Sequence, residues 1–228
     1  MALSLAIPYS ILFIFAGVQL GLISDTVGFL HIQKTEVRTY PIVESSGDAT
    51  TFLLNALPAN LIVDHGHTTN AAAGWGVVLS LAGLLGVWFL FQPRFSSRLR
   101  FKLLLAMTIC LTSLTLLTLA AFIYTFIVTY QTRNQTISLP VAIGQSPLPY
   151  QLNSWTPETW YRAVLQLSIA DKSVADTLRF HYHEMAAWRW WILPYLLVSA
   201  FTLGCTAVHA LQQRRMAVVE SESKELKK

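Results

Sequence analysis

The sequence has little charge and almost no cysteine. Asp, Glu, Lys and Arg make up 12% of its 228 residues, about half the fraction found in a soluble domain. This shortage, together with a hydrophobic fraction of 54%, excludes an ordinary soluble protein and indicates an integral membrane protein. The two cysteines, Cys110 and Cys205, both lie in apolar runs. Neither of the two long polar segments described below can therefore hold an internal disulfide.

The sequence also lacks the short motifs of common catalytic and nucleotide-binding sites. It contains no P-loop, no glycine pattern of a dinucleotide-binding fold, no G-x-S-x-G and no C-x-x-C. Its net charge of +4 does not indicate nucleic-acid binding. The cations gather between two apolar runs and in the C-terminal tail, where membrane topology explains them.

Four apolar runs are each long enough to cross the hydrocarbon layer of about 30 Å as a helix. The two in the middle, residues 71–92 and 103–130, contain no charged side chain, and the link 93–102 between them has four cations and no acid. Lys and Arg concentrate in short cytoplasmic loops. The link therefore predicts a cytoplasmic turn, which orients the other segments.

The orientation divides the chain into alternating helices and loops. The predicted segments are transmembrane helix 1–23, extracytoplasmic loop 24–70, transmembrane helix 71–92, basic cytoplasmic turn 93–102, transmembrane helix 103–130, extracytoplasmic loop 131–188, transmembrane helix 189–213 and a disordered cytoplasmic tail 214–228. The predicted fold class is an all-α membrane protein, a four-transmembrane-helix bundle with a small mixed α/β extracytoplasmic cap from the two long loops. Both termini would be cytoplasmic, in the plasma membrane or an endomembrane. A cleaved signal is the alternative for 1–23, disfavoured because no Lys or Arg precedes the run.

The two loops carry local structure signals of their own. In the first, short strands are expected at 36–40, 51–54 and 60–63, with a turn cluster at 44–48. In the second, three prolines predict an extended segment at 136–150. An amphipathic helix should begin with Thr156 as its N-cap, and another should begin at Ser173 or Asp176 and run into the fourth span. Arg189 is expected to extend toward lipid head groups.

Histidines and carboxylates at the outer ends of two spans are the candidate chemical site. Imidazole and carboxylate groups are ligands for zinc or iron and can also serve acid–base chemistry. A helix places side chains three residues apart on one face, which pairs His181 with Glu184. The candidate catalytic or metal-ligating residues are His65, His67, His181 and Glu184. The alternative is that these polar side chains only cap helices at the membrane interface.

A single N-glycosylation pattern, Asn134-Gln135-Thr136, begins the second loop. It lies on the side predicted to be extracytoplasmic and a few residues beyond the third span. Asn134 is therefore the candidate glycosylation site.

The segments 155–161 and 181–190 resemble a family of uncharacterised fungal four-span membrane proteins. They read Trp-Thr-Pro-Glu-Thr-Trp-Tyr and His-x-x-x-Met-x-Ala-Trp-Arg-Trp. The overall plan is also similar to claudin-like and SUR7/PalI-type fungal proteins, which implies the same four-span architecture. The chain departs from the claudin pattern, because it lacks the outer-loop cysteine pair and the Trp-Gly-Leu-Trp motif. The resemblance supplies no catalytic residue.

Two functions of different classes fit these observations. The favoured one is a membrane protein that acts by interaction, as a membrane organiser, sensor accessory or partner subunit. Its expected partners are membrane lipids and a membrane-protein partner or a second copy of the chain, and no nucleic acid. The alternative is a small metal-dependent enzyme, oxygenase-like, that acts on a lipophilic substrate at the outer interface with zinc or iron. A channel or transporter is disfavoured, because the first three spans contain no ionisable Asp, Glu, Lys or Arg.

Overall fold

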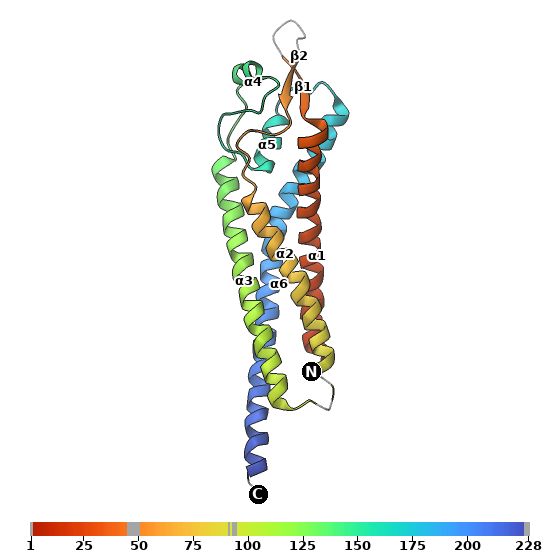
Figure 1. The fold of residues 1–228 in the computed structure, drawn as a ribbon, viewed down its shortest axis with the longest axis vertical. Coiled ribbons are helices and arrows are strands. Elements are labelled where there is room, and N and C mark those ends of the chain that lie inside the picture. The colour runs from red at the N-terminus through yellow and green to blue at the C-terminus, as the bar shows by residue number, and fades with distance from the viewer. Residues whose placement is uncertain (1, 45–50, 91, 93–94, 226–228) are drawn as a thin grey trace. The chain divides into compact units, whose positions relative to one another are not determined.

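The computed structural model describes residues 2–44, 51–90, 92 and 95–225 (Figure 1). Along the chain, its elements are α1 (Ala2–Ile32), a π-helical turn η1 (Gln33–Val37), β1 (Thr39–Val43), β2 (Thr51–Asn55), α2 (Asp64–Leu90), α3 (Ser97–Thr132), α4 (Leu139–Gln145), α5 (Pro157–Val164) and α6 (Lys172–Glu225). Among the described residues, four helices (α1, α2, α3 and α6) are long and apolar enough to cross a membrane. The predicted fold class, a four-helix membrane bundle with a small α/β part, is confirmed.

The chain divides into two compact units. The bundle unit comprises Met1–Leu20, Thr69–Phe122 and Trp191–Lys228, and the αβ unit comprises Gly21–Thr68 and Ile123–Trp190. All four long helices contribute residues to both units, and each unit is described below by itself.

The bundle unit is apolar outside and partly polar inside. Its core contains side chains from all four helices, including Leu12, Leu79, Leu111 and Tyr195. Among the described residues, the polar side chains fully buried in it are Gln19, Ser80, Thr118, Ser199, Thr202 and Thr206. Aliphatic and aromatic residues more than half exposed include Ile7, Ile14, Val78, Leu85, Ile109, Leu116, Leu197 and Phe201. Such a distribution would expose apolar surface at a high cost in water and is the one that lipid favours.

Buried hydroxyl groups of the bundle unit bond to carbonyls of their own helix or to groups of a neighbouring helix. The hydroxyl of Thr206 donates to the Thr202 carbonyl and receives a bond of 3.1 Å from Tyr9. Tyr195 donates to the carbonyl of Ala72 at 2.7 Å. Each bond replaces one that water cannot supply in a hydrocarbon layer, and the two that join different helices, Tyr9–Thr206 and Tyr195–Ala72, help to fix which helix faces meet.

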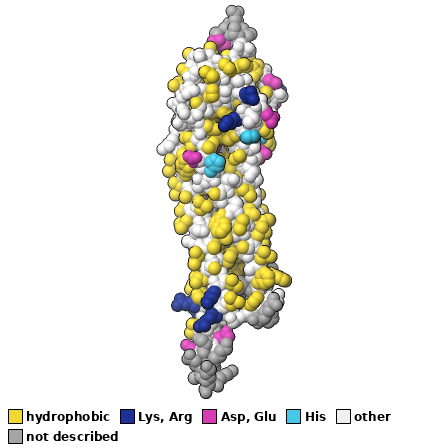
Figure 2. Space-filling view, viewed as in Figure 1, with side chains coloured by type: hydrophobic (Ala, Val, Ile, Leu, Met, Phe, Trp, Pro, Cys, Tyr) yellow, Lys and Arg dark blue, Asp and Glu magenta, His cyan; other side chains and the backbone are white. Residues whose placement is uncertain are grey.

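Cations mark one end of the bundle unit. Arg98, Arg100 and Lys102 all lie in the first turns of α3. Figure 2 shows hydrophobic side chains over much of the visible surface of this unit, with Lys and Arg gathered at one end. This is the distribution expected of a membrane span with its basic end in an aqueous layer.

The αβ unit is built around aromatic rings and a short hairpin. β1 and β2 pair antiparallel, with Tyr40 opposite Leu54. The rings of Trp155 and Trp160 are fully buried and meet edge to face at 5.3 Å. The indole N–H of Trp160 donates to the carbonyl of Ala56 just after β2, at 2.8 Å. Two of the three predicted strands are thus present, as β1 and β2, whereas the predicted strand at 60–63 forms only an isolated bridge between Leu61 and Trp155. The hydrogen bond of Trp160 connects α5 to the end of β2.

The start of α5 follows the sequence prediction, and its first turn pairs with Arg189 of α6. Thr156 accepts from the Thr159 backbone N–H, and the Thr159 side chain accepts from the Thr156 backbone N–H, which forms a capping box. The guanidinium of Arg189 donates two hydrogen bonds, at 2.7 and 2.9 Å, to the carboxylate of Glu158 in the first turn of α5. A partly buried carboxylate is a stronger partner for a guanidinium than water is.

Three other local predictions differ from the structure. The segment expected to be extended at 136–150 contains the helix α4, because Pro140 stands in the first turn, where no backbone N–H is needed. The tail predicted as disordered continues α6 as helix to Glu225. α1 runs to Ile32, so the first strand starts at Thr39 rather than 36. Residues 45–48 of the predicted turn cluster, residues 93–94 of the basic turn and residues 226–228 of the tail lie outside the described residues.

Candidate functional site

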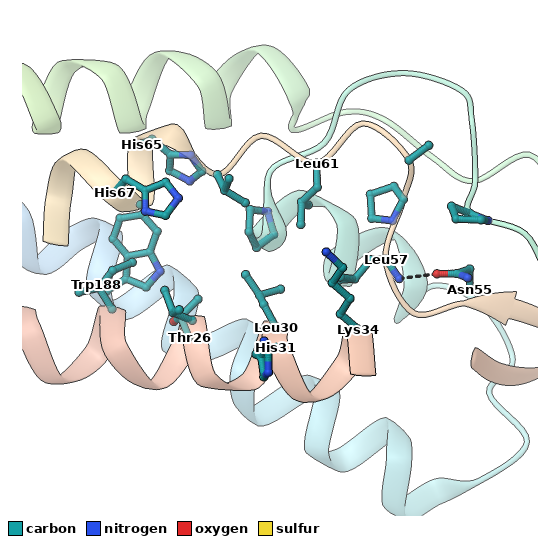
Figure 3. Close-up of a pocket in the computed structure, with 18 of the residues that line it drawn as sticks. Thr26, Leu30, His31, Lys34, Asn55, Leu57, Leu61, His65, His67 and Trp188 are labelled. Atoms are coloured by element: carbon teal, nitrogen blue, oxygen red, sulfur yellow. Dashed lines mark hydrogen bonds between the residues drawn. The ribbon is translucent and has the colours of Figure 1, made fainter. Parts of the chain in front are cut away.

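A pocket of about 800 Å³ lies within the αβ unit (Figure 3). One wall comes from the end of α1 and from η1, which supply Thr26, Leu30, His31 and Lys34. The facing wall comes from the segment after β2 and the start of α2, and Trp188 of α6 completes it. The apolar lining residues are Ile23, Val27, Leu30, Leu57, Pro58, Ala59, Leu61, Val63, Pro149, Pro157 and Trp188. The volume falls in the range of small-molecule sites, about 300–1,000 Å³.

The charged groups of the pocket are all basic. Lys34 and Arg38 line it together with three histidines, and no Asp or Glu is among the described lining residues. Lys34 is exposed, and Figure 3 shows its side chain directed from η1 toward the segment with Leu57 and Leu61. Arg38 follows η1 with a positive φ of 63°, and its Nε donates to the carbonyl of Thr35 at 3.0 Å. An apolar hollow with cations at its wall suits a ligand that is apolar at one end and anionic at the other.

The structure places His65 and His67 in this pocket. His65 is 2% exposed, and its ring stacks on Trp188 with centroids 5.6 Å apart. His67, two residues on, is exposed. His65 therefore packs as a buried aromatic residue, while His67 can present its imidazole to a ligand.

His181 and Glu184 lie together, as their spacing predicts, but with a different third residue. His181 Nδ1 is 3.0 Å from Glu184 Oε2 and 3.6 Å from Asp25 Oδ2. In the part of the chain that the structure describes, these three residues are the group of His, Cys, Asp and Glu whose ligand atoms all lie within 4.8 Å of one another. His65 and His67 do not belong to it. The four predicted residues are thus divided between a pocket and a separate three-residue cluster.

Sequence reasoning missed Asp25 because it assigned residues 24–70 to a loop. In the structure, α1 continues past Asp25 to Ile32, and Asp25 and Phe29 lie one helical turn apart. The ring of Phe29 stacks on His181 with centroids 3.8 Å apart. The signal was present in the sequence, since no proline or turn cluster interrupts the chain between residues 24 and 32.

Two buried tyrosines stiffen the αβ unit close to the pocket residue Arg38. Tyr40 donates a hydrogen bond of 2.5 Å to Oε1 of Gln33. Burial raises the pKa of Tyr40 and of Tyr161 well above the ordinary value for a phenol. Burial therefore favours the neutral, hydrogen-bonding form of both side chains.

The predicted glycosylation site is accessible in the structure. Asn134 is exposed and lies in the turn that follows α3. It lies two residues beyond the end of α3 at Thr132, which agrees with the short distance expected from the sequence.

Comparison of the chain with protein-family models, with curated proteins and with solved structures finds no match.

Proposed function

We propose that the chain is a multi-pass membrane protein that acts by interaction, as an organiser, sensor accessory or partner subunit, and that it binds an anionic amphiphile in the pocket of the αβ unit. The observation that carries this proposal is the combination of apolar walls with Lys34 and Arg38 and the lack of an acid among the described lining residues. A carboxylate or phosphate group would pair with the two cations. The attached chain would lie along the apolar wall.

Helix lengths support a position for this pocket beside the membrane. With a rise of 1.5 Å per residue, the 31 residues of α1 span about 46 Å, whereas the hydrocarbon layer is about 30 Å thick. About ten residues of α1 therefore extend beyond the layer. The pocket residue Leu30 lies in the last turn of α1, and Lys34 follows in η1. In this proposal the basic link before α3 is cytoplasmic and the αβ unit is extracytoplasmic. A lipid-like ligand then reaches the pocket directly from the bilayer.

The size of the pocket favours one chain over two. A volume of about 800 Å³ also has to hold the polar group and its hydration. A single-chain amphiphile such as a fatty acid fits this better than a two-chain phospholipid does. We therefore choose oleate as the probe.

The test is oleate binding to the detergent-purified protein, measured by equilibrium titration beside methyl oleate, which has the same chain and no charge. We expect the wild type to bind oleate at least tenfold more tightly than the ester, because a hydrogen bond to a charged group contributes about 1.5–3 kcal/mol. Lys34→Gln/Arg38→Gln should remove this preference. Ala59→Trp should weaken both ligands, because an indole at this exposed lining position fills the hollow.

Arg162→Gln is the matched control, since Arg162 is an exposed cation of α5 that does not line the pocket. It should bind oleate like the wild type. Equal affinity for oleate and its ester, or equal losses in the Arg162 and Lys34/Arg38 variants, would overturn the proposal.

The alternative function, a metal-dependent enzyme on a lipophilic substrate, is favoured by one observation, the cluster of Asp25, His181 and Glu184. A metal ion with three protein ligands keeps a position for water or substrate. This alternative requires that the cluster bind a metal ion, and the test of metal binding is given below.

A further inference from the structure

We propose that Asp25, His181 and Glu184 bind one divalent transition-metal ion, with zinc(II) as the first ion to test. The inference does not rest on the pocket or on its ligand, because none of the three residues lines the pocket. Imidazole with carboxylate is a donor set that suits zinc and iron(II).

The separations of the donor atoms match those around a small metal ion. Ligand atoms about 2.0–2.2 Å from zinc at tetrahedral angles are about 3.3–3.6 Å from one another. His181 Nδ1 lies 3.0 Å from Glu184 Oε2 and 3.6 Å from Asp25 Oδ2. The two carboxylates also approach within the same 4.8 Å limit. Rotations about the side-chain bonds of Asp25 and Glu184 would bring all three donor atoms to these separations.

Two helices fix the donors. His181 and Glu184 are three residues apart on α6, so a single helix face presents both. Asp25 comes from α1, and Phe29, one turn further along α1, stacks on the imidazole with an interplanar angle of 21°. This stacking holds the ring plane and directs Nδ1 toward both carboxylates. A donor set that is already oriented loses less conformational entropy when it binds a metal.

The charge of the Asp25–His181–Glu184 cluster also favours the binding of a cation. Two carboxylates face one imidazole, and neither makes an ion pair with Lys or Arg among the described residues. The side chain of Glu184 is only 12% exposed, so water screens it poorly. Like charges at this distance repel unless a proton or a cation lies between them. The Asp25 side chain is 57% exposed, which gives an ion from solution a route to the site.

Three protein ligands leave the fourth position of a tetrahedral zinc ion for water or another ligand. This coordination is typical of catalytic zinc and unlike that of structural zinc, which is closed by four protein ligands. The cluster therefore has the form of a reactive site rather than a structural clamp.

The test is zinc content of the detergent-purified full chain after removal of metals with a chelator and dialysis against micromolar zinc(II). We expect stoichiometric zinc in the wild type and a rise in melting temperature when zinc is added. Glu184→Gln and Asp25→Asn should bind zinc at least tenfold more weakly, since even changes outside the ligand shell cost about that much. Asp25→Asn keeps the side-chain shape at an exposed position, so it should fold like the wild type without metal.

His183→Ala is the matched control, because His183 is exposed on the same turn of α6 and lies outside the cluster. It should keep wild-type zinc binding. Substoichiometric zinc in the wild type would show that a shared proton alone holds the cluster, and this would overturn the proposal. Equal losses in the His183 and Glu184 variants would also overturn it, because they would indicate nonspecific binding by surface histidines.

Discussion

Two tyrosine rings of the bundle unit pack directly against glycine. A Cβ atom at Gly83 would collide with the ring of Tyr9, and one at Gly76 with the hydroxyl group of Tyr195. Gly74 and Gly86, in contrast, have no atom within 4 Å of such a Cβ. Gly76 and Gly83, seven residues apart, therefore lie where α2 packs closely against a tyrosine of α6 and one of α1.

Gly83→Ala should therefore destabilise the protein by about 1–3 kcal/mol, the usual cost of overpacking. Tyr9 cannot turn away freely, because its hydroxyl is bonded to Thr206. Gly86→Ala is the control and should change stability by no more than about 1 kcal/mol, in either direction. Thermal unfolding in detergent measures both. Equal effects of the two substitutions would mean that the Tyr9 contact does not restrict α2.

Some contacts of the candidate site residues could be predicted from the sequence, and others could not. The pairing of His181 with Glu184 follows from helical spacing alone and is confirmed at 3.0 Å. The place of Asp25 on a helix could have been predicted from the sequence, but its contact with His181 and the existence of the pocket could not. Both depend on contacts between segments that are far apart in the sequence. The periodicity of hydrophobic residues within a segment does not show which distant segments will be in contact.

Between elements, one ion pair joins α5 to α6. The Glu158 and Arg189 side chains are only 12% and 17% exposed, and both hydrogen bonds of the fork are short. The pair Asp176–Arg179, within α6, is equally short but 55% and 57% exposed. Burial makes the loss of one partner costly, because the other charge is left without solvation.

Glu158→Gln should reduce the free energy of unfolding by about 2–4 kcal/mol. Asp176→Asn removes a carboxylate at similar distance from its arginine and should cost no more than about 0.5 kcal/mol. Chemical denaturation, followed by the fluorescence of the buried tryptophans, compares the two variants. A Glu158 variant as stable as the Asp176 variant would contradict the proposed fastening of α5 to α6.

Prediction of the elements succeeded where local chemistry decides and failed where it does not. The α5 start follows from Thr156 and Pro157, and the hairpin from alternating residues around a turn. α4 was missed because three prolines suggested an extended chain, although Pro140 is compatible with a first helical turn. The length of α6 was missed because the polar residues after its apolar run show no period of their own. A helix that is already nucleated extends through such residues at little cost.

The proposed topology places the αβ unit and the C-terminal side of the fourth span on opposite faces of the membrane. A Cys110→Ser/Cys205→Ser background allows one new cysteine at a time. Ala170→Cys probes an exposed position of the αβ unit, and Arg215→Cys an exposed position on the C-terminal side of the fourth span. In sealed membrane vesicles, a membrane-impermeant maleimide should label one of them before detergent is added and the other only afterwards. Labelling of both under the same condition would contradict the proposed topology.

The measurement that tests the central claim most directly is the site of attachment of a photoactivatable fatty acid to the protein in membranes. The account predicts adducts within residues 23–38 and 55–67, which supply most of the pocket lining. Excess oleate and the Ala59→Trp substitution should both suppress them. Adducts confined to the exposed apolar helices of the bundle unit, unaffected by excess oleate, would show that the protein only dissolves in lipid and does not bind an amphiphile in its pocket.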